Sequence, residues 1–189
     1  ALRAVTSGDA NRDHSRMEEA LLDYRRATDL DPRFALAWAR RGAAARNLGL
    51  NDESTLAFRR AYDLRERVSE PERFYIEAHY YRSVSDEPER AVETYRTWQR
   101  TYPGADVPPT NLASLAANVF GRYEEALPNA REAVRQSPYS SLTMRILVTA
   151  LLGSGRVAEA KQALRDAAGR GIDDAVWHEY AFDLAVLEG

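Results

Sequence analysis

An internal repeat of about 34 residues constrains this chain more than any other feature of its sequence. A short apolar phrase recurs five times along the 189 residues, and its first residue is small in each copy: Ala20, Ser54, Ala91, Ala126 and Ala160. The intervals between these residues are 34, 37, 35 and 34. A repeat of this length is one supersecondary unit that buries its apolar face only by stacking on its neighbours. The period therefore predicts a stacked array.

Each repeat reads as a pair of antiparallel helices. Alanine, the best helix former, occurs 31 times. Small residues recur on both helices of a pair, as at Gly42 on a first helix and Ala20 on a second, and they permit close helix packing. Prolines that lack an amide donor end second helices at Pro32, Pro103 and Pro138. We predict five all-α pairs over about residues 1–34, 35–71, 72–105, 106–140 and 141–170, and a capping helix over 171–189.

Signals at the ends of the predicted helices agree with this division. Ser15 with Glu18, and Ser69 with Glu72, have capping-box spacing. Pro71 and Pro88 suit the first turn of a helix. The glycines predicted to follow helix C-termini are Gly49, Gly121 and Gly155.

The repeat resembles the tetratricopeptide repeat (TPR) in its period and in its Trp, Gly, Ala, aromatic and Pro positions, which Trp38, Gly42, Ala20, Tyr24 and Pro32 illustrate. The resemblance covers essentially the whole chain. It implies an all-α, right-handed α–α superhelix, a TPR solenoid, that forms a single domain over residues 1–189.

A narrower resemblance appears within the repeats. The run 57–70, the positions around 72–81 and the closing run 180–185 are similar to the TPR tails of bacterial Ser/Thr protein kinases and of some winged-helix transcriptional regulators. This resemblance implies a longer signalling protein with an effector domain, and the start at Ala1 without a methionine or signal peptide fits a segment of one. The segment has no glycine-rich phosphate loop, HRD-like or DFG-like motif, so we expect it to be non-enzymatic even if its parent is a kinase. Its compartment stays open between the cytoplasmic and periplasmic sides.

Composition and spacing argue against other kinds of site. The chain has no cysteine, and His14, His79 and His178 stand at no ligand spacing, so we expect no metal and no cofactor. The net charge of −3 and isoelectric point of about 5.7 argue against nucleic acid. No apolar run approaches the roughly 18 residues of a membrane span, so we expect no insertion by this segment.

The expected partner is a protein or peptide, because the TPR resemblance implies a concave groove lined by the first helix of each pair. The predicted groove residues are Leu36, Ala39, Arg40, Ala43, Arg46, Arg73, Ile76, Tyr80, Ser83, Thr110, Asn111, Ser114, Arg145 and Thr149. Chaperone-binding members of the family hold the C-terminal carboxylate of their partner in a clamp of lysine and asparagine side chains. Three of the corresponding positions in this chain are occupied by Val5, Asp9 and Arg40, so the clamp is incomplete. The alternative function is self-association, a homo-oligomer that brings two effector domains together.

Two repeats depart from the pattern. In the second, Arg41 occupies a slot that is usually leucine, and we interpret it as an exposed stem in a loosely packed repeat, because burying it unpaired would be costly. In the third, His79 and Trp98 occupy small-residue slots among several tyrosines. The third repeat is either a differently packed structural repeat or an aromatic-lined recognition patch, in which Tyr, Trp and Arg would be the contact residues.

Overall fold

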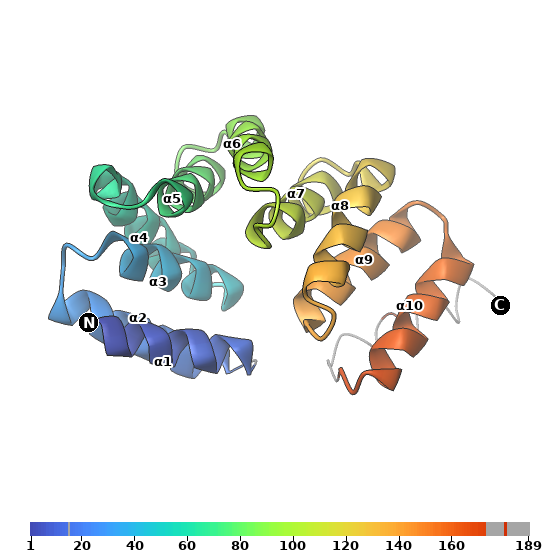
Figure 1. Cartoon of the computed structure of the whole chain (residues 1–189), viewed down its shortest axis with the longest axis horizontal. Helices are drawn as coiled ribbons and strands as arrows, with labels where there is room; N and C mark the ends of the chain where they lie inside the picture. Colours follow the sequence, from blue (N-terminus) through green and yellow to red (C-terminus); the bar gives the residue numbers. More distant parts are fainter. Residues whose placement is uncertain (15, 173–179, 181–189) are drawn as a thin grey trace. The chain divides into compact units, whose positions relative to one another are not determined.

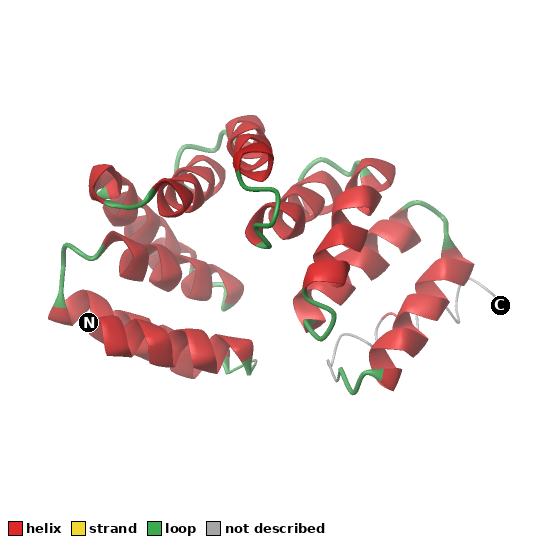
Figure 2. Ribbon diagram, in the orientation of Figure 1, coloured by secondary structure: helices red, strands yellow, loops and turns green. Residues whose placement is uncertain are grey.

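The computed structural model describes residues 1–14, 16–172 and 180, and these residues form helices without a strand (Figures 1 and 2). The α-helices are α1 (Leu2–Asp13), α2 (Met17–Leu30), α3 (Ala35–Asn47), α4 (Asn51–Asp63), α5 (Glu70–Ser83), α6 (Pro88–Thr101), α7 (Val107–Asn118), α8 (Tyr123–Gln136), α9 (Ser141–Gly153) and α10 (Val157–Gly169). A 3-10 turn, η1 (Arg65–Arg67), follows α4. The five predicted helix pairs are confirmed. The predicted capping helix over 171–189 lies almost entirely outside the described residues.

The chain divides into two compact units, and the single domain over residues 1–189 that the resemblance implies stays a prediction. Unit 1 is Ala1–Trp98 and holds α1 to α5 with most of α6, and unit 2 begins at Gln99 and holds α7 to α10. Within unit 1, α1 packs against α2, α3 packs against α4, and α2 contacts α3. Within unit 2, α7, α8, α9 and α10 pack in the same consecutive manner.

In the first two helix pairs of unit 1, an aromatic ring of the second helix packs against a glycine of the first helix. A Cβ built on Gly8 would lie 2.6 Å from the ring of Tyr24, and one built on Gly42 would lie 3.0 Å from the ring of Phe58. Both rings are buried. The two pairs share a separation of 16 residues, which is why the repeat keeps a glycine at one position and an aromatic residue at the other.

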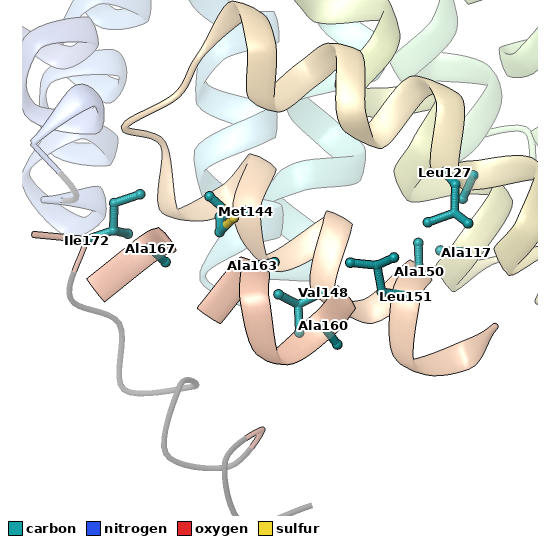
Figure 3. Close-up of a cluster of buried hydrophobic side chains, with 11 residues drawn as sticks. Ala117, Leu127, Met144, Val148, Ala150, Leu151, Ala160, Ala163, Ala167 and Ile172 are labelled. Carbon is teal, nitrogen blue, oxygen red and sulfur yellow. The ribbon is translucent and has the colours of Figure 1, made fainter. Parts of the chain in front are cut away.

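The core of unit 2 is built mainly from small and branched aliphatic side chains (Figure 3). Its buried members come from α7 to α10 and the turn that follows: Ala117, Ala126, Leu127, Met144, Val148, Ala150, Leu151, Ala160, Ala163, Ala167 and Ile172. Tyr180, within the segment predicted to cap the array, packs against this cluster, and its hydroxyl lies 2.9 Å from Oγ1 of Thr149 on α9.

Most of the predicted helix boundaries are confirmed. The side-chain carboxylate of Glu72 accepts hydrogen bonds from the Ser69 amide at 2.9 Å and the Ser69 hydroxyl at 2.7 Å, at the start of α5. Pro71 and Pro88 lie in the first turns of α5 and α6. Gly49, Gly121 and Gly155 adopt φ values of 74°, 65° and 70°, a left-handed conformation that disfavours a Cβ. The other predicted capping box includes Ser15, which lies outside the described residues.

Enlarging a small residue in the unit 2 core should destabilise the fold. Ala126 is fully buried in the core cluster of unit 2, so we expect Ala126→Leu to lower the free energy of unfolding by about 1–3 kcal/mol through overpacking. Urea unfolding followed by circular dichroism measures the change. Ala158→Leu, at an exposed position in the first turn of α10, is the control, and an equal loss in both variants would contradict the packing argument.

Candidate functional site

One stripe of α3 is partly exposed and carries predicted groove residues. Leu36, Arg40 and Ala43 follow one another at spacings of four and three, so they lie on one side of the helix, and all three are partly exposed. Ala39 is different, because its side chain has no exposed surface. Its prediction as a groove contact is corrected: it is a packing residue of unit 1.

Arg40 connects α1 and α5 and has its own counter-charge. Its Nε lies 3.5 Å from Oδ1 of Asp9, and its guanidinium carbon lies 5.0 Å from the ring centroid of Tyr75. Asp9 also accepts a 2.7 Å hydrogen bond from the hydroxyl of Tyr24, and burial followed by this hydrogen bond raises the pKa of Tyr24. Val5, the third residue at a chaperone-clamp position, is buried. These side chains serve contacts within unit 1, in keeping with the incomplete clamp expected from the sequence.

Arg46, near the end of α3, contacts neutral groups among the described residues. Its Nη1 lies 3.2 Å from Nδ1 of His79 and 3.2 Å from Oγ of Ser83, both on α5, and its guanidinium carbon lies 5.7 Å from the ring centroid of Phe58. Arg82 is adjacent on α5, and burial, with a further contribution from the charge of Arg46, lowers its pKa to about 10. The structure thus brings together two predicted groove residues, Arg46 and Ser83, and adds Arg82, which sequence reasoning missed.

His79 is buried, and burial first, then the charges of Arg46, Arg82 and Arg40, holds its pKa well below the usual range. The imidazole is therefore neutral at physiological pH. A guanidinium can only donate, so Nδ1 accepts from Arg46 and Nε2 carries the proton, which it donates to the hydroxyl oxygen of Tyr95 at 3.4 Å. This tautomer connects the Arg46 site to the aromatic core.

On α5, the residues predicted to line the groove are not the same as the residues that contact α3. Ile76 is fully buried, so its prediction as a groove contact is corrected in the same way as that of Ala39. Tyr80 stacks on Tyr62 of α4 with ring centroids 3.8 Å apart, and Arg73 forms a 3.9 Å ion pair with Glu70 on its own helix. On α5, Tyr75, His79 and Ser83 make side-chain contacts with arginines of α3.

The aromatic residues of the third repeat mostly form core. Tyr75, Tyr95 and Trp98 are buried, and the Tyr95 ring stacks against Trp98 with centroids 6.4 Å apart. Phe58 stacks on His79 at 5.0 Å. The bulky residues at the small slots therefore pack together, which favours the structural interpretation of this repeat. Tyr80 and Tyr81 are less buried than these core rings.

The second repeat holds Arg41 in an ion-pair network, so its interpretation as an exposed stem is wrong. Its Nε donates to Oε1 of Glu53 at 2.7 Å, and its Nη1 donates to Oγ1 of Thr28 at 3.1 Å. Arg25 of α2 pairs with the other oxygen of the Glu53 carboxylate. These contacts, with the Arg25 hydrogen bond the largest cause, lower the pKa of Glu53 to about 2. Ser54, which stands where the other four copies have alanine, donates a 2.9 Å hydrogen bond to the carbonyl of Gly42.

The candidate residues of unit 2 are largely engaged with their own helices. Thr110 and Asn111 donate to the carbonyls of Asp106 and Val107 at 3.3 and 3.0 Å, and Ser114 accepts from Asn118 at 3.4 Å. Thr149 contacts Tyr180, as described above, and Arg145 is partly exposed on α9. They form no shared cluster comparable to that around Arg46.

Two other kinds of site are absent from the described part of the chain. There, no three His, Cys, Asp or Glu side chains group as metal ligands do. None of the helices described is both long and apolar enough to cross a membrane.

Comparisons with known proteins find likeness in structure alone. Neither protein-family models nor curated proteins match the chain. Among solved structures, a thermophilic TPR protein, TTC0263 of Thermus thermophilus, superposes with a TM-score of 0.71 at 17% identity, covering 97% of this chain and 98% of that one. YrrB, described as a TPR protein with an unusual peptide-binding site, gives 0.54 at 18% identity over 93% and 89% of the two chains. PilF of Pseudomonas aeruginosa gives 0.57 at 16% identity over 98% and 82%. Taken with the helix pairs and their small-residue packing, these likenesses show that the chain has the fold of a tetratricopeptide-repeat solenoid.

Proposed function

We propose that this chain is a non-catalytic interaction module that binds a peptide or protein segment along the first helices of unit 1. The observation that carries the proposal is the partly exposed stripe of Leu36, Arg40 and Ala43 on α3, which adjoins Arg46 and the hydroxyl of Ser83. Apolar surface beside arginine is typical of interface residues that contribute most to affinity. The peptide-binding site named for YrrB is compatible with this use of the fold.

We further propose that the module regulates or localises a larger bacterial signalling protein, a Ser/Thr kinase in the first instance. The support is the narrower sequence resemblance over residues 57–70. Part of that resemblance falls on packing residues, because Ala57, Phe58 and Ala61 are fully buried. The sequence encoded upstream of Ala1 distinguishes a kinase from a transcriptional regulator.

The binding proposal is tested with peptides selected from a random library against the purified chain. Leu36→Ser removes an apolar contact from the α3 stripe. We expect it to lower the affinity for a selected peptide about tenfold, since burying a leucine side chain contributes roughly 1.5–3 kcal/mol. Fluorescence anisotropy with the labelled peptide measures the affinity. Leu56→Ser is the matched control, because Leu56 is 52% exposed on α4, a second helix.

An unchanged affinity in Leu36→Ser, or an equal loss in Leu56→Ser, would reject the α3 stripe as the binding surface. The self-association alternative stays a prediction. Light scattering at high protein concentration tests it, and a monomer would count against it.

A further inference from the structure

Two neighbouring arginines of unit 1 lack a negatively charged partner among the described residues. Arg46 forms hydrogen bonds only with His79 and Ser83, which are neutral, and no described carboxylate lies within ion-pair distance of Arg46 or Arg82. Both arginines lie in the last turns of the first helices α3 and α5, and both are half-buried.

The other half-buried arginines of unit 1 show how unusual this is. Arg40 pairs with Asp9, Arg41 with Glu53, and Arg65 with Glu77 at 3.5 Å. The chain carries 29 acidic residues against 26 basic ones, so acids are not scarce. Arg46 and Arg82 are left with a local excess of positive charge.

That excess has an electrostatic cost in the absence of a ligand. Removing a cation from water without a counter-charge is unfavourable, and two adjacent cations repel each other. The lowered pKa of Arg82, caused by burial and by the charge of Arg46, reflects both effects. An anion bound by these arginines would offset their repulsion and replace the lost hydration.

The donors needed to hold an anion are present. Both hydrogen bonds of Arg46 use Nη1, which leaves the donors of Nε and Nη2, and a guanidinium matches a carboxylate or phosphate with two parallel hydrogen bonds. Because Nδ1 of His79 accepts from Arg46, the guanidinium is also held in position from the buried side.

We infer that Arg46 and Arg82 form an anion-binding site that takes an acidic side chain, a carboxylate or a phosphate ester, of a bound peptide. The inference rests on the proposed peptide-binding function and adds the chemistry of the ligand. Nucleic acid does not fit, since only two arginines are uncompensated here and the chain is acidic overall.

A purely structural role makes a different prediction for Arg82. The C-terminal end of a helix carries a partial negative charge that favours a cation, so Arg82 could serve only to stabilise the end of α5. In that case Arg82→Gln would lower the thermal midpoint and leave peptide binding unchanged. A binding site held at an electrostatic cost predicts the opposite: an equal or higher midpoint, and weaker binding.

The test compares the selected peptides and three variants of the chain. We expect the library to yield peptides with a conserved Asp or Glu. Arg82→Gln and Arg46→Gln should each lower the affinity for these peptides about tenfold, the effect of one charge-assisted hydrogen bond. Arg59→Gln, at an exposed arginine of α4, changes the net charge equally and should leave the affinity unchanged. A synthetic peptide with phosphoserine at the acidic position separates the two ligand chemistries, and tighter binding of either form supports the site.

The inference fails if the selected peptides have no acidic preference, or if Arg59→Gln weakens binding as much as Arg82→Gln does. The proposed function is still supported after that result if Leu36→Ser lowers the affinity for the same peptides. If neither Leu36 nor the arginines affect binding, the proposed function fails as well.

Discussion

Replacing Tyr95 with alanine is expected to lower the free energy of unfolding by about 3–5 kcal/mol, the range for removing a large aromatic side chain from a core. Tyr95 has no exposed surface and stands 16 residues after His79, as Tyr24 and Phe58 do after Gly8 and Gly42. Its ring contacts both His79, with centroids 6.1 Å apart, and Trp98. His79 occupies the position on α5 where the first two repeats have glycine. The backbone of α5 therefore cannot move in to close the cavity that Tyr95→Ala leaves.

Urea unfolding followed by circular dichroism measures the loss for Tyr95→Ala, and two variants calibrate it. Tyr95→Phe keeps the ring but leaves the buried Nε2–H of His79 without its 3.4 Å acceptor, so a smaller loss of about 1–2 kcal/mol is expected. Tyr139→Ala removes a tyrosine that is 75% exposed in unit 2 and should change the free energy of unfolding by no more than about 0.5 kcal/mol. A small loss in Tyr95→Ala would mean that the third repeat is loosely packed, and the recognition-patch interpretation would then regain support.

The period, the capping signals and the small residues were sufficient to predict the helix pairs. This succeeded because the repeat encodes a local requirement: Gly42 must be small wherever Phe58 packs against it, and the same separation recurs at Gly8 and Tyr24. Boundary signals such as Ser69 with Glu72 are equally local, since both partners lie within one turn of helix. Each of these signals relates residues close in sequence, so a single sequence was enough to find them.

The candidate site was only partly predictable, because it depends on which side of α5 meets α3. Carry-over from the repeat placed Tyr80 and Ile76 in the groove, whereas the structure turns Tyr75 and His79 toward α3. The third repeat deviates from the standard pattern at His79, so its helix register could not be copied from the others. Arg82 carried no sequence signal either, since its lack of a carboxylate partner appears only when the neighbouring helices are in place.

The partner of Arg41 was missed for the same reason, and it leads to the other large expected effect. Glu53 on α4 joins Arg25 of α2 and Arg41 of α3, so one carboxylate connects three helices from two repeats. Glu53→Gln leaves both arginines without a counter-charge, and breaking a buried ion pair in this way typically costs about 3–5 kcal/mol. Because Arg25 is 39% exposed and can be rehydrated, we expect a loss of about 2–3 kcal/mol at pH 7.

The pH dependence of unfolding provides an independent test of Glu53. Since the arginines lower its pKa from 4.5 to about 2, its contribution to stability is fully present above pH 4.5 and is lost as the pH falls from 4.5 toward 2. Glu53→Gln should therefore be less stable than the parent chain at pH 7 and converge with it at the acid end of that window. The control is Glu159→Gln, which breaks exposed pairs with Arg131 and Arg156 and should cost no more than about 1 kcal/mol. A constant difference between Glu53→Gln and the parent chain from pH 7 to pH 2 would show that the glutamine is harmful for steric reasons. Convergence would show that the charge of Glu53 holds the three helices together.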